Sequence, residues 1–433
     1  MNRRRNIILG IVMACCLGIG LLYFQKPVVL EIGVFTGSNW DVPSPDNGKM
    51  IDKAIKKFEK QHPNVQVKYT SGIIKSDYSK WISNKAVSGD LPDVFMVLSD
   101  DISVFSEVGI LQPLDSIIAN DGDFKTSDYY SSSYETGTVN GKQYALPYES
   151  VPTLMFVNRT LLEENGIEIP DENWTWDDFY SICQQVTKDT DGDGVVDQFG
   201  EYGYTWQHAL SSNGGTLFNE SGTKSYVDSN QMTQAVEFVR KLSALNTGET
   251  VTSEMFDKGS VAFCPMLFSE YRTYKPYPWS VKKYSTFEWD CIPMPAGPNG
   301  DNTSEMDTLM FGMSKESHNK KLAWEFLKML SCDEKTQTNL FKYSQGVSVL
   351  KKVSTSSTIE KYIQEDAPKG NSYNLDFFDQ TMEHAVVVKK FNGYDQVFSI
   401  VDSEIQRLIT TDEDIENALL TLNNEVEISL GKK

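Results

Sequence analysis

Short apolar runs alternate with amphipathic helical stretches from Glu31 onward, and this alternation limits the possible fold more than any other feature. Residues 31–35 and 93–98 have the composition of buried strands, whereas residues 65–69 alternate apolar and polar side chains. Between them, apolar side chains recur at helical spacing over residues 51–62 and 78–87. Strands that alternate with helices predict an α/β fold whose parallel sheet carries helices on both faces.

The same alternation resumes after a predicted break at residues 144–150. Further strands are expected at 154–157 and 259–264, and further helices at 176–186, 232–244 and 321–330. Ser331 with Glu334 matches a capping box that opens another helix, and Thr411 with Asp414 is expected to cap the last one. The chain is therefore predicted to be α/β throughout, with ligands expected at the carboxyl ends of its strands.

The first residues have the pattern of a membrane-targeting segment. Three arginines at 3–5 precede an uncharged, largely apolar run of 18 residues from Ile7 to Phe24. As a helix this run would be roughly 27 Å long, close to the thickness of a bilayer core. No small-x-small cleavage site follows, so residues 1–28 are predicted to form an uncleaved anchor helix. Lipidation on Cys15 and simple secretion are alternatives. All three place the body outside the cytoplasm, and an anchor helix or a lipid on Cys15 would hold it at the extracellular face of the cytoplasmic membrane.

Charge and cysteine content exclude several classes of function. The chain has 40 Lys and Arg against 60 Asp and Glu, which gives a net charge of −20. A field of that sign repels phosphate backbones and anionic headgroups, so nucleic acid and broad electrostatic membrane binding are not expected. The six cysteines contain no CxxC pair, which argues against a zinc cluster or a disulfide scaffold.

Several short motifs occur along the chain in a recognisable order and spacing. They are the strand and loop 33–40, the helix 54–59, Leu91-Pro92-Asp93-Val94, the stretches 109–114 and 144–148, the tryptophan-rich stretch 174–179, Pro293-Met294-Pro295, and the helix 323–327. Together they resemble the family 1 extracellular solute-binding proteins, the group that includes the maltose-binding protein. The resemblance covers nearly all of residues 29–430.

This resemblance implies a two-lobed, type II periplasmic-binding-protein-like fold with the ligand in a cleft between the lobes. Lobe one would comprise residues 29–148 and 295–346, and lobe two residues 149–294 and 347–433. Three crossings would join the lobes, and ligand binding would close them about these crossings.

A sugar receptor needs aromatic faces for C–H patches and fixed polar groups for hydroxyls. The resemblance, combined with these residue types, gives the candidate ligand-binding residues as Trp40, Asp41, Asp100, Asp101, Tyr148, Glu149, Trp206, Glu270, Tyr271, Arg272 and Tyr394. Each has a structural alternative: the loop tryptophans can pack on their own lobe, the paired aspartates can cap helices, and the residues at the first crossing can form a hinge.

Residues 189–197 match the start of an EF-hand-type calcium loop, with Gly194 at position 6. The oxygen ligands at positions 1, 3, 5, 7 and 9 would come from Asp189, Asp191, Asp193, the Val195 carbonyl and Asp197. Position 12, which usually holds a bidentate Glu, is Gly200. We expect a structural calcium site; the alternative is an acidic turn without metal.

The sequence contains no phosphate-binding GxxxxGK[ST] loop, no GxSxG motif and no HExxH motif. The histidines at 62, 208, 318 and 384 are scattered, and each is expected to be structural or solvated. These absences give no support for catalysis, and the resemblance implies a non-enzymatic, monomeric sugar-binding component of an ABC importer, which hands a mono- or oligosaccharide to a permease. The alternatives are a secreted glycoside hydrolase and a tethered sugar sensor.

Overall fold

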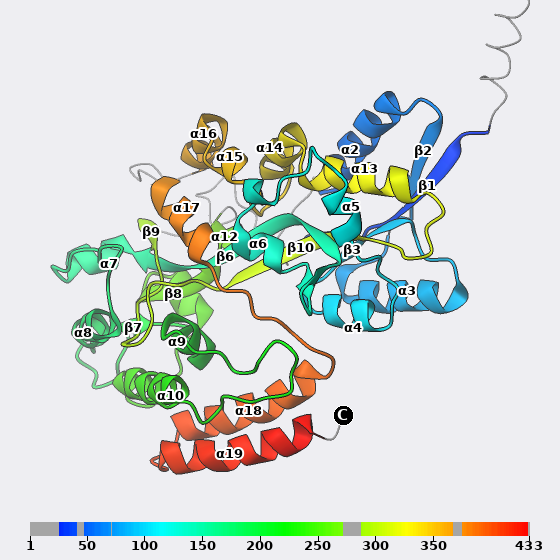
Figure 1. Ribbon diagram of the computed structural model, residues 1–433. Coiled ribbons are helices and arrows are strands. Elements are labelled where there is room, and N and C mark those ends of the chain that lie inside the picture. The colour runs from blue at the N-terminus through cyan, green and yellow to red at the C-terminus, as the bar shows by residue number, and fades with distance from the viewer. Residues whose placement is uncertain (1–25, 41–46, 71, 272–286, 367–374, 432–433) are drawn as a thin grey trace, which may run out of the picture.

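The computed structural model describes residues 26–40, 47–70, 72–271, 287–366 and 375–431 (Figure 1). Four of the sequence predictions lie outside this part of the chain: the anchor segment with Cys15, Asp41, Arg272, and the side chain of Tyr271. Among the described residues, no helix is both long enough and apolar enough to cross a bilayer.

The strands are β1 (Val28–Gly33), β2 (Val65–Tyr69), β3 (Val94–Val97), β4 (Thr138–Val139), β5 (Lys142–Gln143), β6 (Ala145–Asn158), β7 (Phe199–Glu201), β8 (Val261–Leu267), β9 (Trp289–Ile292) and β10 (Met306–Met313). The helices in the first half are α2 (Asn47–Gln61), α3 (Lys75–Ser88), α4 (Ile102–Glu107), α5 (Asp115–Ala119), α6 (Ser131–Glu135), α7 (Arg159–Glu164), α8 (Trp176–Val186) and α9 (Trp206–Ser212). Those in the second half are α10 (Asn230–Ser243), α11 (Ser253–Asp257), α12 (Phe268–Tyr271), α13 (Lys320–Ser331), α14 (Glu334–Tyr343), α15 (Lys351–Ser354), α16 (Ser357–Asp366), α17 (Leu375–His384), α18 (Tyr394–Ile409) and α19 (Ile415–Leu430).

One eight-stranded sheet runs through the molecule in the order β2-β1-β3-β10-β6-β8-β7, with β9 paired to β6. The opening strands are parallel, as the β-α-β alternation predicts, and β7 is parallel to β8. The rest of the sheet adds antiparallel pairs, because β10 is antiparallel to both β3 and β6, and β6 is antiparallel to β8 and β9. The sheet is therefore mixed.

Strand β6 connects the two ends of this sheet. Every one of its 14 residues is buried. Its first part pairs with β10 and its second part with β8 and β9, so the predicted break at residues 144–150 is wrong. Pro147 and Pro152 lie inside the strand, and proline is normally a strand breaker. The pairing with β10 shifts register between Leu309 and Met310, and this irregularity lies between the two prolines.

Three hydrophobic clusters fill the interior. The first packs β1–β3, α2 and α3 against α13, at the upper right of Figure 1. The second packs α8, α9 and α10 against α18 and α19, at the lower left. The third joins β6, β8 and β9 to α14–α17, toward the upper left of Figure 1. The lobe boundaries that were predicted from the sequence stay a prediction.

Candidate functional site

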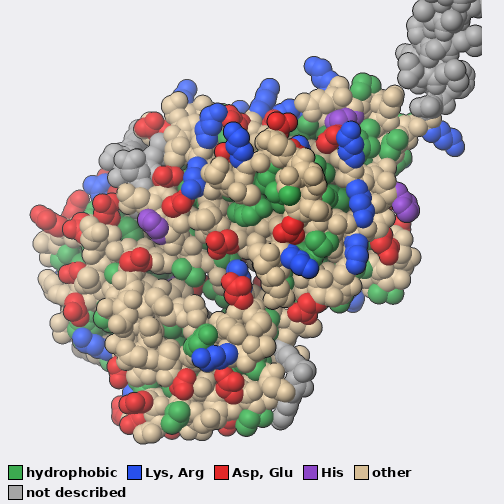
Figure 2. Space-filling view, viewed as in Figure 1, with side chains coloured by type: hydrophobic (Ala, Val, Ile, Leu, Met, Phe, Trp, Pro, Cys, Tyr) green, Lys and Arg blue, Asp and Glu red, His purple; other side chains and the backbone are tan. Residues whose placement is uncertain are grey.

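A cavity of about 770 Å³ lies between α6 on one side and α9 and α18 on the other. Figure 2 shows the molecule hollowed near its centre, with acidic side chains close to the rim. The segment 385–393, which connects α17 to α18, forms a further wall of the cavity. A volume of this size falls within the range of small-molecule sites, which span about 300–1,000 Å³.

Three stacked aromatic rings form one wall. The ring centroids of Trp206 and Phe398 are 5.7 Å apart with a 27° interplanar angle, and those of Phe398 and Tyr394 are 5.6 Å apart at 16°. Tyr394 and Phe398 are four residues apart in α18, which places their side chains on one face of that helix. Trp206 is only 1% exposed, whereas Phe398 is half-buried. Phe398 therefore presents more ring surface to the cavity than Trp206 does.

The N-terminus of α9 fixes the position of Trp206, which is the first residue of that helix. The backbone N–H of Thr205 donates to Nδ1 of His208 at 3.2 Å, in the reciprocal manner of a capping box. Trp206 Nε1 donates to Asp402 Oδ1 at 2.8 Å, which ties α9 to α18. The cap and this hydrogen bond together fix the aromatic wall relative to the cavity.

Both polar and apolar side chains line the rest of the cavity. Glu305 lies next to the start of β10 and lines the cavity. Its Oε1 accepts a 2.6 Å hydrogen bond from Ser211 Oγ of α9. Burial lowers the pKa of the His208 imidazole, and the negative charge of Glu305 opposes this shift. Burial raises the pKa of the Tyr394 phenol, and the Glu305 charge adds to the increase.

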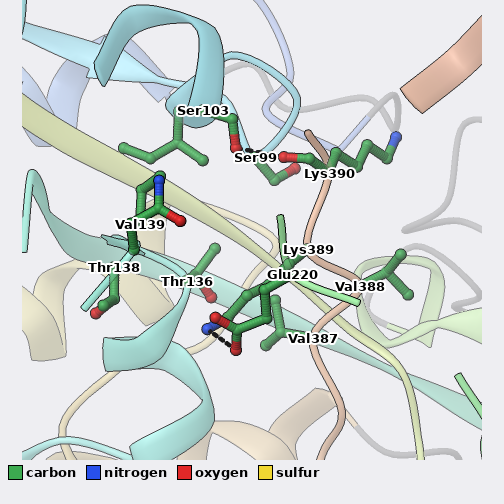
Figure 3. Close-up of a pocket in the computed structure, with 12 residues that line it drawn as sticks. Ser99, Ser103, Thr136, Thr138, Val139, Glu220, Val387, Val388, Lys389 and Lys390 are labelled. Atoms are coloured by element: carbon green, nitrogen blue, oxygen red, sulfur yellow. Dashed lines mark hydrogen bonds and ion pairs between the residues drawn. The ribbon is translucent and has the colours of Figure 1, made fainter. Parts of the chain in front are cut away.

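A smaller recess adjoins the cavity and shares Glu220 and residues 387–390 with it (Figure 3). Two consecutive lysines of the connecting segment form ion pairs here with different parts of the chain. Lys389 Nζ lies 2.7 Å from Glu220 Oε1, as Figure 3 shows, and Lys390 Nζ lies 2.6 Å from Asp100 Oδ1. Ser103 of α4 also donates to the carbonyl of Lys390. The connecting segment is thus held both to the region after β3 and to the loop that carries Glu220.

Of the residues predicted from the sequence, Trp206 and Tyr394 line the cavity. Asp100 does not line it but forms an ion pair with Lys390, which does. Asp101 instead accepts a 2.6 Å hydrogen bond from Ser79 of α3, and burial raises its pKa. Glu270 of α12 is half-buried and is not among the residues that line the cavity.

Trp40 and Tyr148 lie in the first hydrophobic cluster and do not line this cavity. Trp40 is 5% exposed, and Tyr148 packs edge-on against Phe311 at 5.1 Å between ring centroids. Little of either ring is available to a ligand in this conformation. Trp40 thus has the arrangement given as its structural alternative, packing on its own part of the molecule, whereas Tyr148 is a core residue.

Glu149 is fully buried and joins three parts of the chain. Its carboxylate accepts hydrogen bonds from Asn39 Nδ2 at 2.5 Å, from the Gly346 N–H at 2.7 Å and from the Ser344 hydroxyl. Burial raises the pKa of Glu149, and the hydrogen bonds from Ser344 and Asn39 oppose that shift. The contacts place Glu149 as a link between the loop after β1, strand β6 and the segment after α14.

Sequence reasoning missed His208, Glu305 and Phe398. His208 was expected to be structural or solvated, and its cap on α9 is such a structural role, but His208 also lines the cavity. The spacing of Thr205 and His208 is a capping-box spacing, and Phe398 follows Tyr394 by one helical turn, so both carried a local signal. Glu305 carried none, because only the fold brings it to α9.

In the acidic loop, carboxylate oxygens of Asp189, Asp191 and Asp197 lie within 4.8 Å of one another. The Asp189 carboxylate accepts from the N–H groups of Gly192 and Gly194 at 2.7 and 2.8 Å, and these bonds lower its pKa. Asp193 accepts from the Val195 N–H at 2.8 Å and is not part of that oxygen cluster.

Comparison with known proteins places the chain among proteins of related fold and sequence. Residues 43–336 match the model of the bacterial extracellular solute-binding protein family. The galactooligosaccharide-binding protein of Bacillus subtilis is 24% identical over 391 residues, which cover 88% of this chain and 86% of that protein.

Two solved structures are similar to nearly the whole chain. One is the cyclic alpha-maltosyl-1,6-maltose binding protein of Arthrobacter globiformis, with a TM-score of 0.77, 18% identity, and coverage of 94% of this chain and 100% of that one. The other is the substrate-binding protein of Listeria monocytogenes in complex with cycloalternan, with a TM-score of 0.71, 19% identity, and coverage of 94% and 99%. These likenesses confirm the predicted two-lobed α/β fold.

Proposed function

Because this chain belongs to the bacterial extracellular solute-binding protein family, we propose that it is the sugar-capturing component of an ABC importer. The family and the similar structures are binding proteins, and we infer that this chain releases its sugar unchanged. The proposal includes a mono- or oligosaccharide ligand, delivery to an importer permease, and a monomeric state.

The observation that carries the sugar proposal is the composition of the cavity. The flat face of Phe398 suits the C–H patches of a sugar ring, and the aromatic wall continues into Tyr394. Carboxylate, imidazole and hydroxyl groups share the same cavity, and these are the donors and acceptors that sugar hydroxyls require. The chain's net charge of −20 does not favour an acidic sugar.

We propose closure about the crossing strands as the binding step. Strands β6 and β10 pair along the middle of the molecule, and the lobes predicted from the sequence would move about them. A ligand in the cavity would contact α6 on one side and α9 and α18 on the other, so its binding would favour the closed arrangement.

We also propose that the protein is attached at the extracellular face of the membrane through residues 1–28 or through a lipid on Cys15.

A thermal-shift screen of the full chain tests the sugar proposal. The panel would contain galactobiose, maltotriose, a cyclic glucose tetrasaccharide and glucuronic acid. We expect at least one neutral sugar to raise the melting temperature and to be recovered chemically intact. If no sugar raised the melting temperature, or if a hydrolysis product accumulated, the proposal would be wrong; a product would favour the glycoside hydrolase alternative.

We propose in addition that residues 189–197 bind calcium in a structural role. The carboxylates of Asp189, Asp191 and Asp197 are close enough to share one ion, and carboxylate oxygens are the ligands that calcium prefers. Asp193 and the Val195 carbonyl complete the predicted ligand set. The missing carboxylate at Gly200 predicts weaker binding than in a full EF-hand loop.

A further inference from the structure

Two polar atoms on the cavity wall have no hydrogen-bond partner among the described residues. One is Nε2 of His208, and the other is Oε2 of Glu305. Both residues line the cavity and are half-buried. Neither of the two atoms is completely buried, so both retain contact with open space at the cavity.

The helix cap determines which nitrogen of His208 carries the proton. A backbone N–H can only donate, so the 3.2 Å hydrogen bond from Thr205 requires Nδ1 to be the acceptor. Burial lowers the pKa of His208, so the imidazole is neutral near pH 7. A neutral imidazole whose Nδ1 accepts must carry its proton on Nε2. His208 therefore offers a fixed N–H donor at the cavity.

Glu305 offers the complementary acceptor. Ser211 lies three residues after His208 in α9, and its Oγ donates a 2.6 Å hydrogen bond to Oε1 of Glu305. This hydrogen bond holds the Glu305 carboxylate against the helix that carries His208. Among the residues that the structure describes, no lysine or arginine forms an ion pair with Glu305. Its remaining oxygen is consequently available to accept from a ligand.

We propose that His208 and Glu305 form a donor–acceptor pair that recognises neighbouring hydroxyls of a sugar whose ring lies against Phe398. This inference rests on the proposed function and names two specificity-determining residues within it. One hydroxyl oxygen accepts from His208 Nε2–H, and the adjacent hydroxyl donates to Glu305 Oε2. A hydroxyl can donate and accept at once, whereas the carboxylate of a uronic acid would be repelled by Glu305.

Substitutions at His208 separate the cap from the donor. Glu is a standard capping-box residue at this position, so His208→Glu keeps an acceptor for the Thr205 N–H but removes the donor. Gln caps through its carbonyl and still offers N–H groups, so His208→Gln retains both functions. Glu305→Gln keeps the size of the side chain and removes its charge. His318→Glu, on an exposed histidine that does not line the cavity, is the matched control.

Calorimetric titration of the full chain with the tightest-binding neutral sugar of the panel tests the pair. We expect affinity to fall at least tenfold in His208→Glu and in Glu305→Gln, to fall less than threefold in His208→Gln, and to stay unchanged in His318→Glu. A deoxy analogue that lacks the hydroxyl assigned to His208 should bind the unaltered chain at least tenfold more weakly than the parent sugar does. The His208→Glu variant should bind this analogue and the parent sugar with equal affinity.

Nitrogen-15 NMR of the histidine side chains supplies a second readout. We expect the Nε2–H tautomer for His208 and a change in the Nε2 resonance when sugar is added. An Nδ1–H tautomer, or normal affinity in both His208→Glu and Glu305→Gln, would overturn the inference while leaving the proposed function intact. Failure of the unaltered chain to bind any sugar would instead refute the proposed function, and the inference with it.

Discussion

The sharpest prediction concerns Phe398, the middle ring of the aromatic wall. Replacing it with leucine keeps an apolar side chain in place but removes the flat face. The ring contacts Trp206 at 5.7 Å and Tyr394 at 5.6 Å between centroids, so both stacking contacts are lost. Each such aromatic pair contributes about 0.5–1.5 kcal/mol beyond burial, so the free energy of unfolding should fall by about 1–3 kcal/mol.

The loss of affinity can be worked out separately. If a bound sugar covers about 60 Å² of apolar surface on the exposed part of the Phe398 ring, the contact contributes about 1.5 kcal/mol at ~25 cal/mol per Å². That corresponds to about a tenfold change in Kd. We therefore expect Phe398→Leu to bind its sugar about tenfold more weakly than the unaltered chain.

Phe124→Leu is the matched control. Phe124 is also half-buried and contacts three aromatic rings, those of Tyr129 at 5.8 Å, Tyr134 at 6.5 Å and Trp324 at 5.4 Å between centroids, but it does not line the cavity. Urea unfolding should show a comparable loss of stability in both variants, whereas calorimetric titration should show weaker binding in Phe398→Leu alone. Equal sugar affinity in the two variants would refute the assignment of Phe398 as a sugar platform.

Three further predictions concern stability. Glu149→Ala leaves three donors without their acceptor, at about 1–3 kcal/mol each, so urea unfolding should show a loss of about 3–9 kcal/mol; a loss below about 1 kcal/mol would contradict the linking role. Burial raises the pKa of Glu201 to about 7 from 4.5. The contribution of Glu201 to stability is therefore complete below pH 4.5 and is lost as the pH rises through 7, so the unaltered chain should lose up to about 3 kcal/mol relative to Glu201→Gln between pH 5 and 8. If the free energy of unfolding depended on pH in the same way in the unaltered chain and in Glu201→Gln, this role of Glu201 would be excluded. Calcium at about 100 times its Kd should stabilise the chain by about 2.7 kcal/mol, and Asp191→Asn should abolish that gain; a calcium-independent melting temperature would remove the metal proposal.

Elements that combine a clear period with local caps were predicted well. Helix α8 spans Trp176–Val186 as expected, because its apolar side chains follow a helical period and Thr175 forms a capping box with Asp178. Strand β2 at Val65–Tyr69 also matches. For α14 the capping prediction was wrong: Asp333 is the N-cap residue and accepts from the Thr336 N–H at 2.8 Å.

Features set by distant parts of the chain could not be predicted. Strand β6 contains two prolines, and only its pairing with β10 and then with β8 and β9 explains why it stays extended. Likewise, Glu305 meets Ser211 across 94 positions of sequence. Composition identified aromatic candidates but did not distinguish Tyr394, on the cavity wall, from Tyr148, in the core.

A crystal structure of the full chain with its tightest-binding neutral sugar would test the central claim most directly. The account predicts an intact sugar in the cavity, with one ring face against Phe398 and hydroxyls within hydrogen-bond distance of His208 Nε2 and Glu305 Oε2. Sugar density outside this cavity, or a cleaved sugar within it, would contradict the account.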